Sequence, residues 1–366
     1  MYRKIMGFLE AWKENEHRKP LILQGARQVG KTYSILEFGR IHYENVAYFN
    51  FETNPKLNET FEEKISPDYL IPILSHIAGQ TIVKEKTLIV FDEVQLCERA
   101  LTSLKYFCED APDYHIIVAG SLLGVAVNRA KFSFPVGTVD MKTLYPMDME
   151  EFMIAVREDE LVEQIKKCFE TNRPMPSALH DVAMQLYRQY LVVGGMPECV
   201  MQFVQTGDYI LIRHTQDTIL TSYLNDMGKY NNLNEIKKTR LAYDNITVQL
   251  SKKNTRFQYK LIKKGGRASE FENAIEWLCL SGIASQVYRV EQIKKPLENY
   301  RDIDAFKIYV SDLGLLCAKK DLAANDILYM VEELNDFKGG MTENYVNVQL
   351  AINGYNTYYW ESERGA

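Results

Sequence analysis

The six cysteines of this 366-residue chain are scattered, and no two of them form a C-x-x-C pair. The six histidines are equally dispersed. A structural zinc site is therefore not expected, and the thiols are interpreted as buried and reduced. No apolar run approaches the ~18 residues of a membrane span, and Glu10 and Lys13 interrupt any signal-peptide core. We expect a cytoplasmic protein without a membrane segment.

Positive charge is also in deficit, because the formal net charge is −6. This balance argues against a surface that binds a polyanion over its whole extent, although it leaves room for a local basic patch. The chain is too long for one ordinary domain, so we expect two or three.

The stretch PLILQGARQVGKT, residues 20–32, has the spacing G-x-x-x-x-G-K-T after a short apolar run. Glycines permit backbone angles and close approaches that a side chain would block, so the loop N–H groups can cradle phosphate oxygens. In such a Walker A loop the lysine reaches the β- and γ-phosphates and the threonine ligates Mg²⁺, at the positive end of a helix. A glycine-rich structural turn is the alternative. The expected nucleotide-binding residues are Gly25, Ala26, Arg27, Gln28, Val29, Gly30, Lys31, Thr32 and Tyr33.

Apolar runs alternate with helical patterns around this loop. Such alternation predicts an α/β domain, with a parallel sheet covered on both faces. Residues 1–19 form an amphipathic pattern, for a helix that packs beside the nucleotide or only caps the sheet. Helices are expected around 57–77 and 96–107. The expected strands are Leu21–Leu23, Val46–Phe51, Thr87–Asp92, His115–Ala119 and Val139–Leu144.

The third expected strand ends in the acidic pair Asp92 and Glu93. Asp92 can hold Mg²⁺ directly or through water, and Glu93 can polarise the attacking water. By itself the pair could be a strand that happens to end in two carboxylates. Downstream of a phosphate-binding loop it favours hydrolysis over transfer to a small molecule. The N-K-x-D signature of guanine recognition is absent, so adenine is favoured.

Two further polar residues are candidates for the catalytic set. Ser121 follows the fourth expected strand, where it can contact the γ-phosphate or the attacking water; a local hydrogen bond in a strand-to-loop turn is the alternative. Arg129 is the best candidate for an arginine that senses the γ-phosphate, in cis or as a finger in trans. Arg27, inside the loop, is the weaker alternative.

Residues 150–230 have helical patterns throughout, interrupted at Gly194–Pro197. The interruption is interpreted as a tight turn that seats Glu198 and the next helix, and a hinge is the alternative. The pattern of residues 231–292 predicts helices at 236–250 and 268–280, followed by a strand or wing at 282–288. Helices followed by a β-wing are the order of elements in a winged helix.

A basic stretch lies within this second part. Residues 251–269 contain no acid, and their cations are Lys252, Lys253, Arg256, Lys260, Lys263, Lys264 and Arg267. The stretch is interpreted as a contact to the DNA backbone through Lys252–Arg267. A solvated lysine-rich face and a protein-interaction module are the alternatives.

The last part of the sequence predicts a strand at 305–310 and then a helix with Ser311 as its N-cap. Glu343 is expected to head an apolar helix, and residues 357–360 form a strand-like run.

Five motifs in this order resemble one family of predicted bacterial and archaeal AAA-type ATPases with a DUF4143-type C-terminal region. They are GARQVGKT, FDEVQ, AGSLL, LYPMDMEEF and YLVVGGMPE, and the resemblance covers nearly the whole chain. It implies an ATP site at Gly25, Gly30, Lys31, Thr32, Asp92, Glu93 and Ser121. It also implies a restriction-endonuclease-like domain after residue 301, with Glu343 as its helix acid.

Two features depart from this family. The A-G-R segment that many relatives have before L-Y-P is Phe134–Thr138, FPVGT, without arginine. The acidic E-V-D-F strand of the nuclease-like domain is not found up to Ala366. A two-metal nuclease needs further carboxylates, so no nuclease activity is assigned.

The sequence therefore predicts an AAA-type P-loop ATPase core at 1–150, a helical lid-like region at 151–230, a winged-helix-like domain at 231–300 and an incomplete α/β domain at 301–366. It predicts Mg²⁺-dependent ATP hydrolysis, with Lys31, Glu93, Ser121 and Arg129 as catalytic residues and Thr32 and Asp92 as metal ligands. The alternative is a non-hydrolysing, nucleotide-gated switch that acts on an unknown protein partner. The sequence does not fix the oligomeric state.

Overall fold

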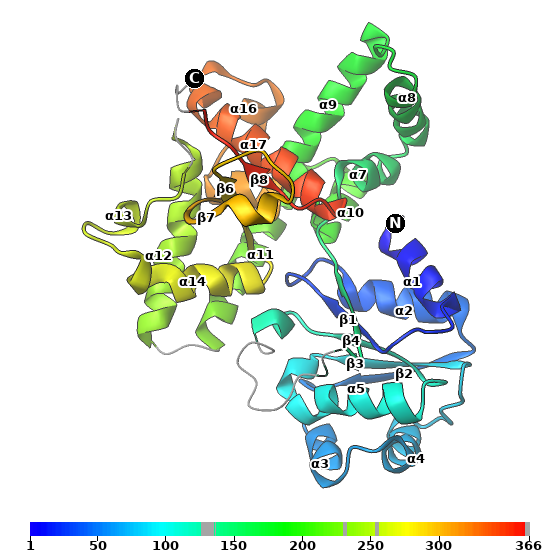
Figure 1. Ribbon diagram of the computed structural model, residues 1–366. Helices are drawn as coiled ribbons and strands as arrows, with labels where there is room; N and C mark the ends of the chain where they lie inside the picture. Colours follow the sequence, from blue (N-terminus) through cyan, green and yellow to red (C-terminus); the bar gives the residue numbers. More distant parts are fainter. Residues whose placement is uncertain (126–134, 136, 230–232, 253–255, 363–366) are drawn as a thin grey trace. The chain divides into compact units, whose positions relative to one another are not determined.

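The computed structural model describes residues 1–125, 135, 137–229, 233–252 and 256–362 (Figure 1). Contacts divide the chain into two units. We call Arg3–Leu144 the N-terminal unit and Tyr145–Ala366, with Met1–Tyr2, the C-terminal unit. The finer division expected within residues 145–366 stays a prediction.

Five parallel strands form the sheet of the N-terminal unit, in the order β2-β3-β4-β1-β5. Every residue of β3 and β4 is buried, because helices on both faces leave no side of the sheet to water. Since β1 and β3 both pair with β4, the ends that carry the loop and the acidic pair converge at one edge. The strands are β1 (Leu21–Gln24), β2 (Asn45–Asn50), β3 (Thr87–Asp92), β4 (His115–Ala119) and β5 (Asp140–Thr143).

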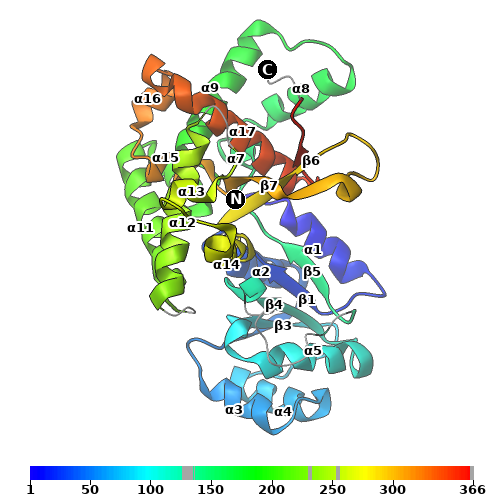
Figure 2. The same cartoon turned by 60° about the vertical axis from the view of Figure 1, so that its left-hand side comes forward.

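Helices α1 and α2 lie on one face of this sheet, and α5 lies on the other with α3 and α4 beyond it (Figures 1 and 2). The rings of Phe51, Phe61 and Phe91 meet with centroids 5.6 to 5.8 Å apart, which anchors α3 to β3. The helical elements are α1 (Ile5–Glu14), α2 (Lys31–His42), α3 (Lys56–Glu63), α4 (Pro67–Ala78), η1 (Val94–Leu96) and α5 (Glu98–Asp110).

The strands of the N-terminal unit form close to where the sequence predicts them. β3 and β4 have the expected bounds, while β2 ends at Asn50 instead of Phe51. The helical region expected around residues 57–77 is two helices, because a proline, Pro67, begins α4. Proline fits the first turn of a helix, but it has no N–H with which to continue one.

Helices dominate the C-terminal unit, and the helical region expected for residues 150–230 is confirmed. No helix in the described part of the chain has the length and apolar character that crossing a membrane requires. The helices before residue 281 are α7 (Met149–Ala155), α8 (Asp159–Glu170), α9 (Ser177–Val193), α10 (Pro197–Thr206), α11 (Tyr209–Lys229), α12 (Leu233–Leu250), α13 (Tyr259–Ile262) and α14 (Ala268–Leu280). The later ones are η2 (Leu297–Tyr300), α15 (Leu313–Lys319), α16 (Ala324–Leu328), η3 (Glu332–Leu334) and α17 (Asn335–Ile352).

A small second sheet follows α14 in the C-terminal unit. Its strands are β6 (Ala284–Val290), β7 (Arg301–Val310) and β8 (Tyr358–Tyr359), in the order β7-β6-β8. β6 pairs antiparallel with β7 and parallel with β8. The domain boundary expected after residue 300 falls between the paired strands β6 and β7. The winged-helix interpretation of α12, α14 and these strands stays a prediction.

Asp312 joins three segments of the C-terminal unit that are far apart in the sequence. Its carboxylate accepts hydrogen bonds from the backbone N–H groups of Gly195 (2.6 Å) and Leu315 (2.8 Å). The carbonyl of Gly195 accepts one from the N–H of Met147 (2.7 Å). A Cβ on Gly195 would lie 2.0 Å from the Met147 carbonyl oxygen, so this approach requires glycine. We call these four residues the Asp312 junction.

Two expectations for the last part of the chain are wrong. Asp312 caps α15, not Ser311, whose hydroxyl donates to the carbonyl of Gly282 instead (2.5 Å). Glu343 does not head a helix, because α17 begins at Asn335 and Glu343 lies within it.

Candidate nucleotide-binding and hydrolysis site

The loop between β1 and α2 has the backbone of a phosphate-binding loop. Gly25 and Gly30 have φ angles of 147° and 91°, and Gln28 has a φ of 66°. A Cβ on Gly25 would lie 2.1 Å from the carbonyl oxygen of Leu144, so glycine is required where β1 passes the end of β5. Successive turns of this kind aim backbone N–H groups into one concavity that suits an anion, and the first turn of α2 adds its own N–H groups.

Lys31 places its ammonium within this loop. The side chain is only 7% exposed, and its Nζ donates hydrogen bonds to the carbonyl oxygens of Gly25 (2.9 Å) and Ala26 (2.8 Å). A buried ammonium is costly unless it is hydrogen-bonded, and these carbonyls meet that need. A phosphate oxygen inside the loop can take their place.

Thr32 and Asp92, the two expected metal ligands, are in contact. The Thr32 hydroxyl donates to Asp92 Oδ2 (2.9 Å), and the Tyr48 hydroxyl donates to the same oxygen (2.7 Å). Burial, with the bond to Asp92 acting in the same direction, raises the pKa of Tyr48 to about 12, so this phenol remains a donor. A hydroxyl and a carboxylate are the oxygen ligands that Mg²⁺ prefers.

Glu93 and Ser121 also meet, although they follow different strands. The Ser121 hydroxyl is 3.4 Å from Glu93 Oε2, to which it donates. Glu93 has a φ of 51°, the left-handed conformation that is uncommon for a residue with a side chain. The sharp turn after β3 thus separates the roles of the acidic pair: Asp92 contacts Thr32, and Glu93 contacts the end of β4.

The other expected site residues differ in their placement. Ala26 and Val29 are buried in the loop, and Arg27 is half-buried. The side chain of Tyr33 is 62% exposed. Arg129 lies outside the described residues, so its expected contact with the γ-phosphate stays a prediction.

The sequence did not single out three residues that contact this site: Arg3, Tyr48 and Gln95. The buried Arg3 donates from Nη1 to the carbonyl of Val29 (3.0 Å), which ties the segment before α1 to the loop. No sequence motif predicts that Arg3 contacts this loop. For Tyr48 a signal exists, because Tyr48 and Asn50 alternate along β2 and thus share a face of the strand beside β3.

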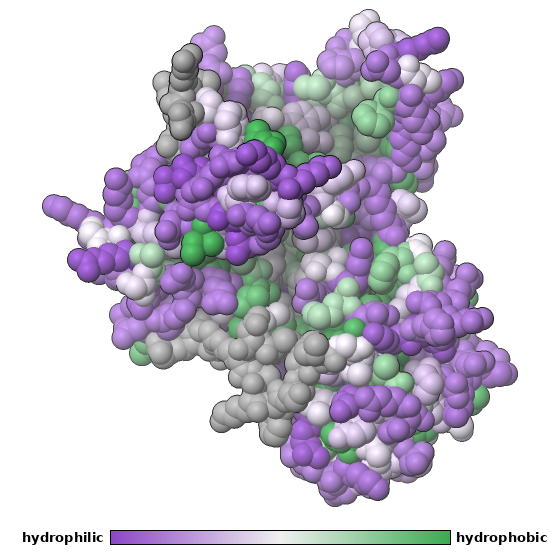
Figure 3. Space-filling view, viewed as in Figure 1, coloured by the Kyte–Doolittle hydropathy of each residue, from purple (hydrophilic) through white to green (hydrophobic). Residues whose placement is uncertain are grey.

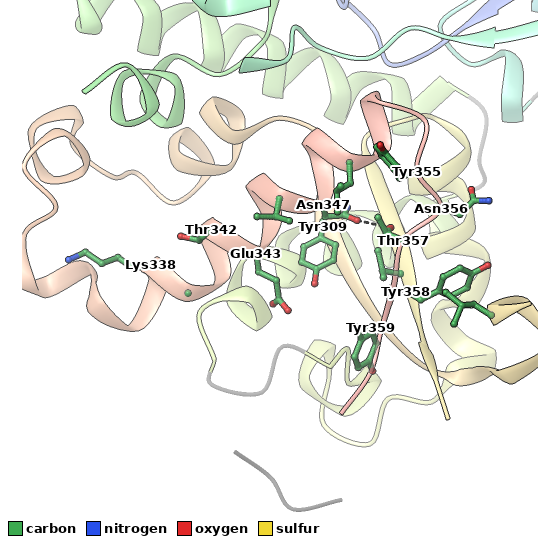
Figure 4. Close-up of a pocket in the computed structure, with 15 residues that line it drawn as sticks. Tyr309, Lys338, Thr342, Glu343, Asn347, Tyr355, Asn356, Thr357, Tyr358 and Tyr359 are labelled. Atoms are coloured by element: carbon green, nitrogen blue, oxygen red, sulfur yellow. Dashed lines mark hydrogen bonds between the residues drawn. The ribbon is translucent and has the colours of Figure 1, made fainter. Parts of the chain in front are cut away.

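A cavity of about 980 Å³ lies in the C-terminal unit between α17 and the segment around β8 (Figure 4). Glu343 lines it and accepts a hydrogen bond from Lys307 (2.5 Å), whose ammonium lies 4.7 Å from the centre of the Tyr359 ring. Within the described residues no cluster of three or more His, Cys, Asp or Glu side chains could hold a metal here.

Comparison with known proteins agrees with the fold of the N-terminal unit. Residues 17–153 match the family model of an AAA domain. Residues 184–326 match a domain of unknown function, DUF8612, instead of the expected DUF4143-type region. No curated protein matches the chain.

One solved structure shows a similar fold. The Walker-type ATPase PABY2304 of Pyrococcus abyssi superposes with a TM-score of 0.52 at 14% identity, over 87% of this chain and 95% of that one. The Aeropyrum pernix ORC2 protein, in ADPNP–ADP complexes, gives a TM-score of 0.42 at 10% identity, over 96% and 95%. The second likeness is too weak to carry an argument. The fold and the AAA-domain match define an AAA-type P-loop ATPase domain, followed by a helical region and a small second sheet.

Proposed function

We propose that this chain binds ATP with Mg²⁺ at residues 25–32 and hydrolyses it to ADP and phosphate. The observation that carries the proposal is the contact of Thr32 with Asp92 (2.9 Å), with Glu93 as the next residue. The loop geometry supports a triphosphate ligand, and the AAA-domain match supports ATP as the nucleotide.

In the proposed reaction, the loop N–H groups and Lys31 bind the β- and γ-phosphates. Thr32 and Asp92 would hold Mg²⁺, which would neutralise charge on the phosphate oxygens. Glu93 accepts a proton from a water whose oxygen bonds to the γ-phosphorus, while the bond to the β–γ bridging oxygen breaks and its electron pair leaves with ADP. Ser121, at the end of β4, contacts the γ-phosphate or the attacking water.

We assign the contact with the γ-phosphate to Arg129, in cis or as a finger in trans, and regard Arg27 as the second choice. The segment Phe134–Thr138 offers no arginine for this role. A finger in trans requires an oligomer.

We further propose that the nucleotide state controls binding of DNA to the basic stretch 252–267. Hydrophilic and apolar residues are mixed around α13, the short helix of this stretch (Figure 3). Lys263 has an acidic neighbour, Glu270, 3.4 Å away. Lys253 lies outside the described residues. The exposed cations of the stretch are Lys252, Lys260, Lys263, Lys264 and Arg267.

ATP binding tests the foundation of this proposal. We expect Lys31→Ala to lower the affinity for Mg·ATP by about 100-fold or more, because the variant loses a charge-assisted contact inside a buried loop. Titration with a fluorescent ATP analogue measures it, and the exposed Lys105→Ala on α5 is the matched control. Equal affinity of Lys31→Ala and wild type would contradict the proposed site. Tight binding without turnover would favour the nucleotide-gated switch.

A further inference from the structure

Gln95 lies between the expected base and the end of β4. It belongs to η1, the short turn after the acidic pair. Its amide Nε2 donates a hydrogen bond to Glu93 Oε2 (2.5 Å), the oxygen that also accepts from Ser121 at 3.4 Å. Of these two donors, Gln95 is much the closer, so it makes the stronger hydrogen bond to the carboxylate.

The oxygen of the same amide accepts no hydrogen bond within the described part of the chain. Gln95 Oε1 is buried and has no hydrogen-bond partner among the described residues. The amide cannot simply be turned over, because its oxygen would then face an ionised carboxylate, which only accepts. A buried polar atom without a partner requires an explanation. The bond from Nε2 to Glu93 supplies one, since it fixes where the oxygen must lie.

Gly120 makes the space for this amide. A Cβ on Gly120 would lie 2.1 Å from Gln95 Oε1 and 3.2 Å from its Cδ. Gly120 is not among the glycines with a positive φ, so its backbone conformation is open to any residue. Glycine is therefore needed here for room and not for its backbone angles, and the group that needs the room is the amide of Gln95.

We propose that Gln95 is a positioning residue that orients the carboxylate of Glu93 for proton abstraction. Gly120, which has no side chain, leaves the space that the Gln95 amide occupies. This inference rests on the proposed function. The carboxylate starts from a left-handed backbone position, and without Gln95 the Ser121 hydroxyl, 3.4 Å away, is the remaining side-chain donor to it in the described part of the chain.

The test is a double-mutant cycle of Gln95→Ala and Gly120→Ala, with steady-state turnover and ATP affinity measured for each protein. We expect Gln95→Ala to lower kcat by roughly 10- to 100-fold and to leave the Kd for ATP unchanged. Gly120→Ala displaces the amide and has the same effects. In the double variant the added methyl meets no amide, so Gly120→Ala causes no further loss.

Gln95→Glu separates positioning from packing. It preserves the size of the side chain but replaces the amide donor by a second carboxylate, which only accepts, so we expect kcat to fall at least as far as in Gln95→Ala. An unchanged kcat in Gln95→Ala would overturn the inference, and so would losses that multiply in the double variant. Absence of turnover in the wild type would overturn the proposed hydrolysis as well, and this outcome is visible before any variant is made.

Discussion

Asp92 of the N-terminal unit and Asp312 of the C-terminal unit are both buried, but they differ in the kind of partner that holds them. Asp92 is 5% exposed and accepts hydrogen bonds from two side-chain hydroxyls, those of Thr32 and Tyr48. Asp312 is 2% exposed and accepts from backbone N–H groups, those of Gly195 and Leu315 among them. Burial alone does not distinguish these carboxylates.

The partners distinguish them. A hydroxyl can rotate, and its oxygen can become a metal ligand, so the contacts of Asp92 can be exchanged for a ligand. A backbone N–H has no such freedom, and an N–H left without an acceptor in the interior is costly. Asp92 therefore suits a binding site, whereas Asp312 fixes the chain. The G-G-M-P signature belongs to the second kind of site, since Gly195 serves the Asp312 junction.

Removal of the structural carboxylate gives the largest effect that we expect. Asp312→Ala leaves at least two buried N–H groups without an acceptor, at about 1–3 kcal/mol each, so the free energy of unfolding falls by roughly 2–6 kcal/mol. Denaturant titration, followed through the unfolding of the C-terminal unit, measures this decrease in the free energy of unfolding. Asp208→Ala is the control, because Asp208 also accepts from two backbone N–H groups but is exposed; its loss is about 1 kcal/mol. Equal losses in the two variants would contradict the distinction.

The pH dependence of stability sharpens the same point. Burial raises the pKa of Asp312 from 3.8 to about 6, against the lowering effect of its backbone hydrogen bonds. Because the folded-state pKa lies above the unfolded value, this carboxyl favours folding most below about pH 4, and the contribution falls by about 3 kcal/mol as the pH rises through 6. Its neighbours Tyr190, Tyr223 and Cys199 stay neutral here, since burial raises their pKa values too.

Asp312→Asn isolates this titration. The unfolding free energy of the variant minus that of wild type is expected to increase by about 3 kcal/mol between pH 4 and pH 7, because every other group cancels in the difference. A constant difference over this range would show that Asp312 does not titrate with a raised pKa.

A smaller effect is expected at Asp92, where Tyr48→Phe removes one hydroxyl donor. Partners that orient a metal ligand typically contribute 10- to 100-fold in affinity, and we expect the lower value, about 10-fold, for Mg²⁺. Calorimetric titration of Mg²⁺ into the ATP complex measures it, with Tyr106→Phe on α5 as the control. If Tyr48→Phe bound Mg²⁺ as tightly as wild type, the contact with Asp92 would be structural, like those of Asp312.

The smallest effect concerns the surface of the C-terminal unit. Charge reversal at Lys263 and Lys264 is expected to weaken duplex DNA binding and to reduce the slope of log affinity against log salt by up to about 2. Fluorescence anisotropy at several salt concentrations measures the slope. Lys294 and Lys295, an exposed pair outside the basic stretch, provide the control. Unchanged affinity would remove the basic stretch from the account and leave the C-terminal unit without a nucleic-acid contact.

The sequence correctly predicted the structural features that depend on residues close together in the chain. The loop at 25–32 and the strand that ends at Asp92 follow from local spacing and apolar runs. Gln95 contacts Gly120, and Gly195 contacts Asp312. These contacts join residues distant in the sequence, so no local sequence pattern predicts them. Ser311 and Asp312 are both competent N-caps, and only the tertiary contact with Gly195 decides between them.

The beginning of α17 was missed for a related reason. Gly339 and Gly340 lower the helix propensity of its first half, so the sequence placed the helix start at Glu343. In the structure Gly340 lies against α12, where a Cβ would approach the Leu250 carbonyl oxygen to 2.0 Å. Close packing of the two helices thus requires the glycine that made the helix hard to predict.

Turnover of Glu93→Gln beside wild type, with ATP affinity measured on the same preparations, tests the central claim most directly. The variant preserves the shape of the side chain and removes its basicity. The account predicts an unchanged Kd for Mg·ATP and a kcat lowered by about 10²- to 10⁴-fold, while the exposed Glu109→Gln on α5 behaves as wild type. Equal turnover of Glu93→Gln and wild type would contradict the assignment of Glu93 as the base.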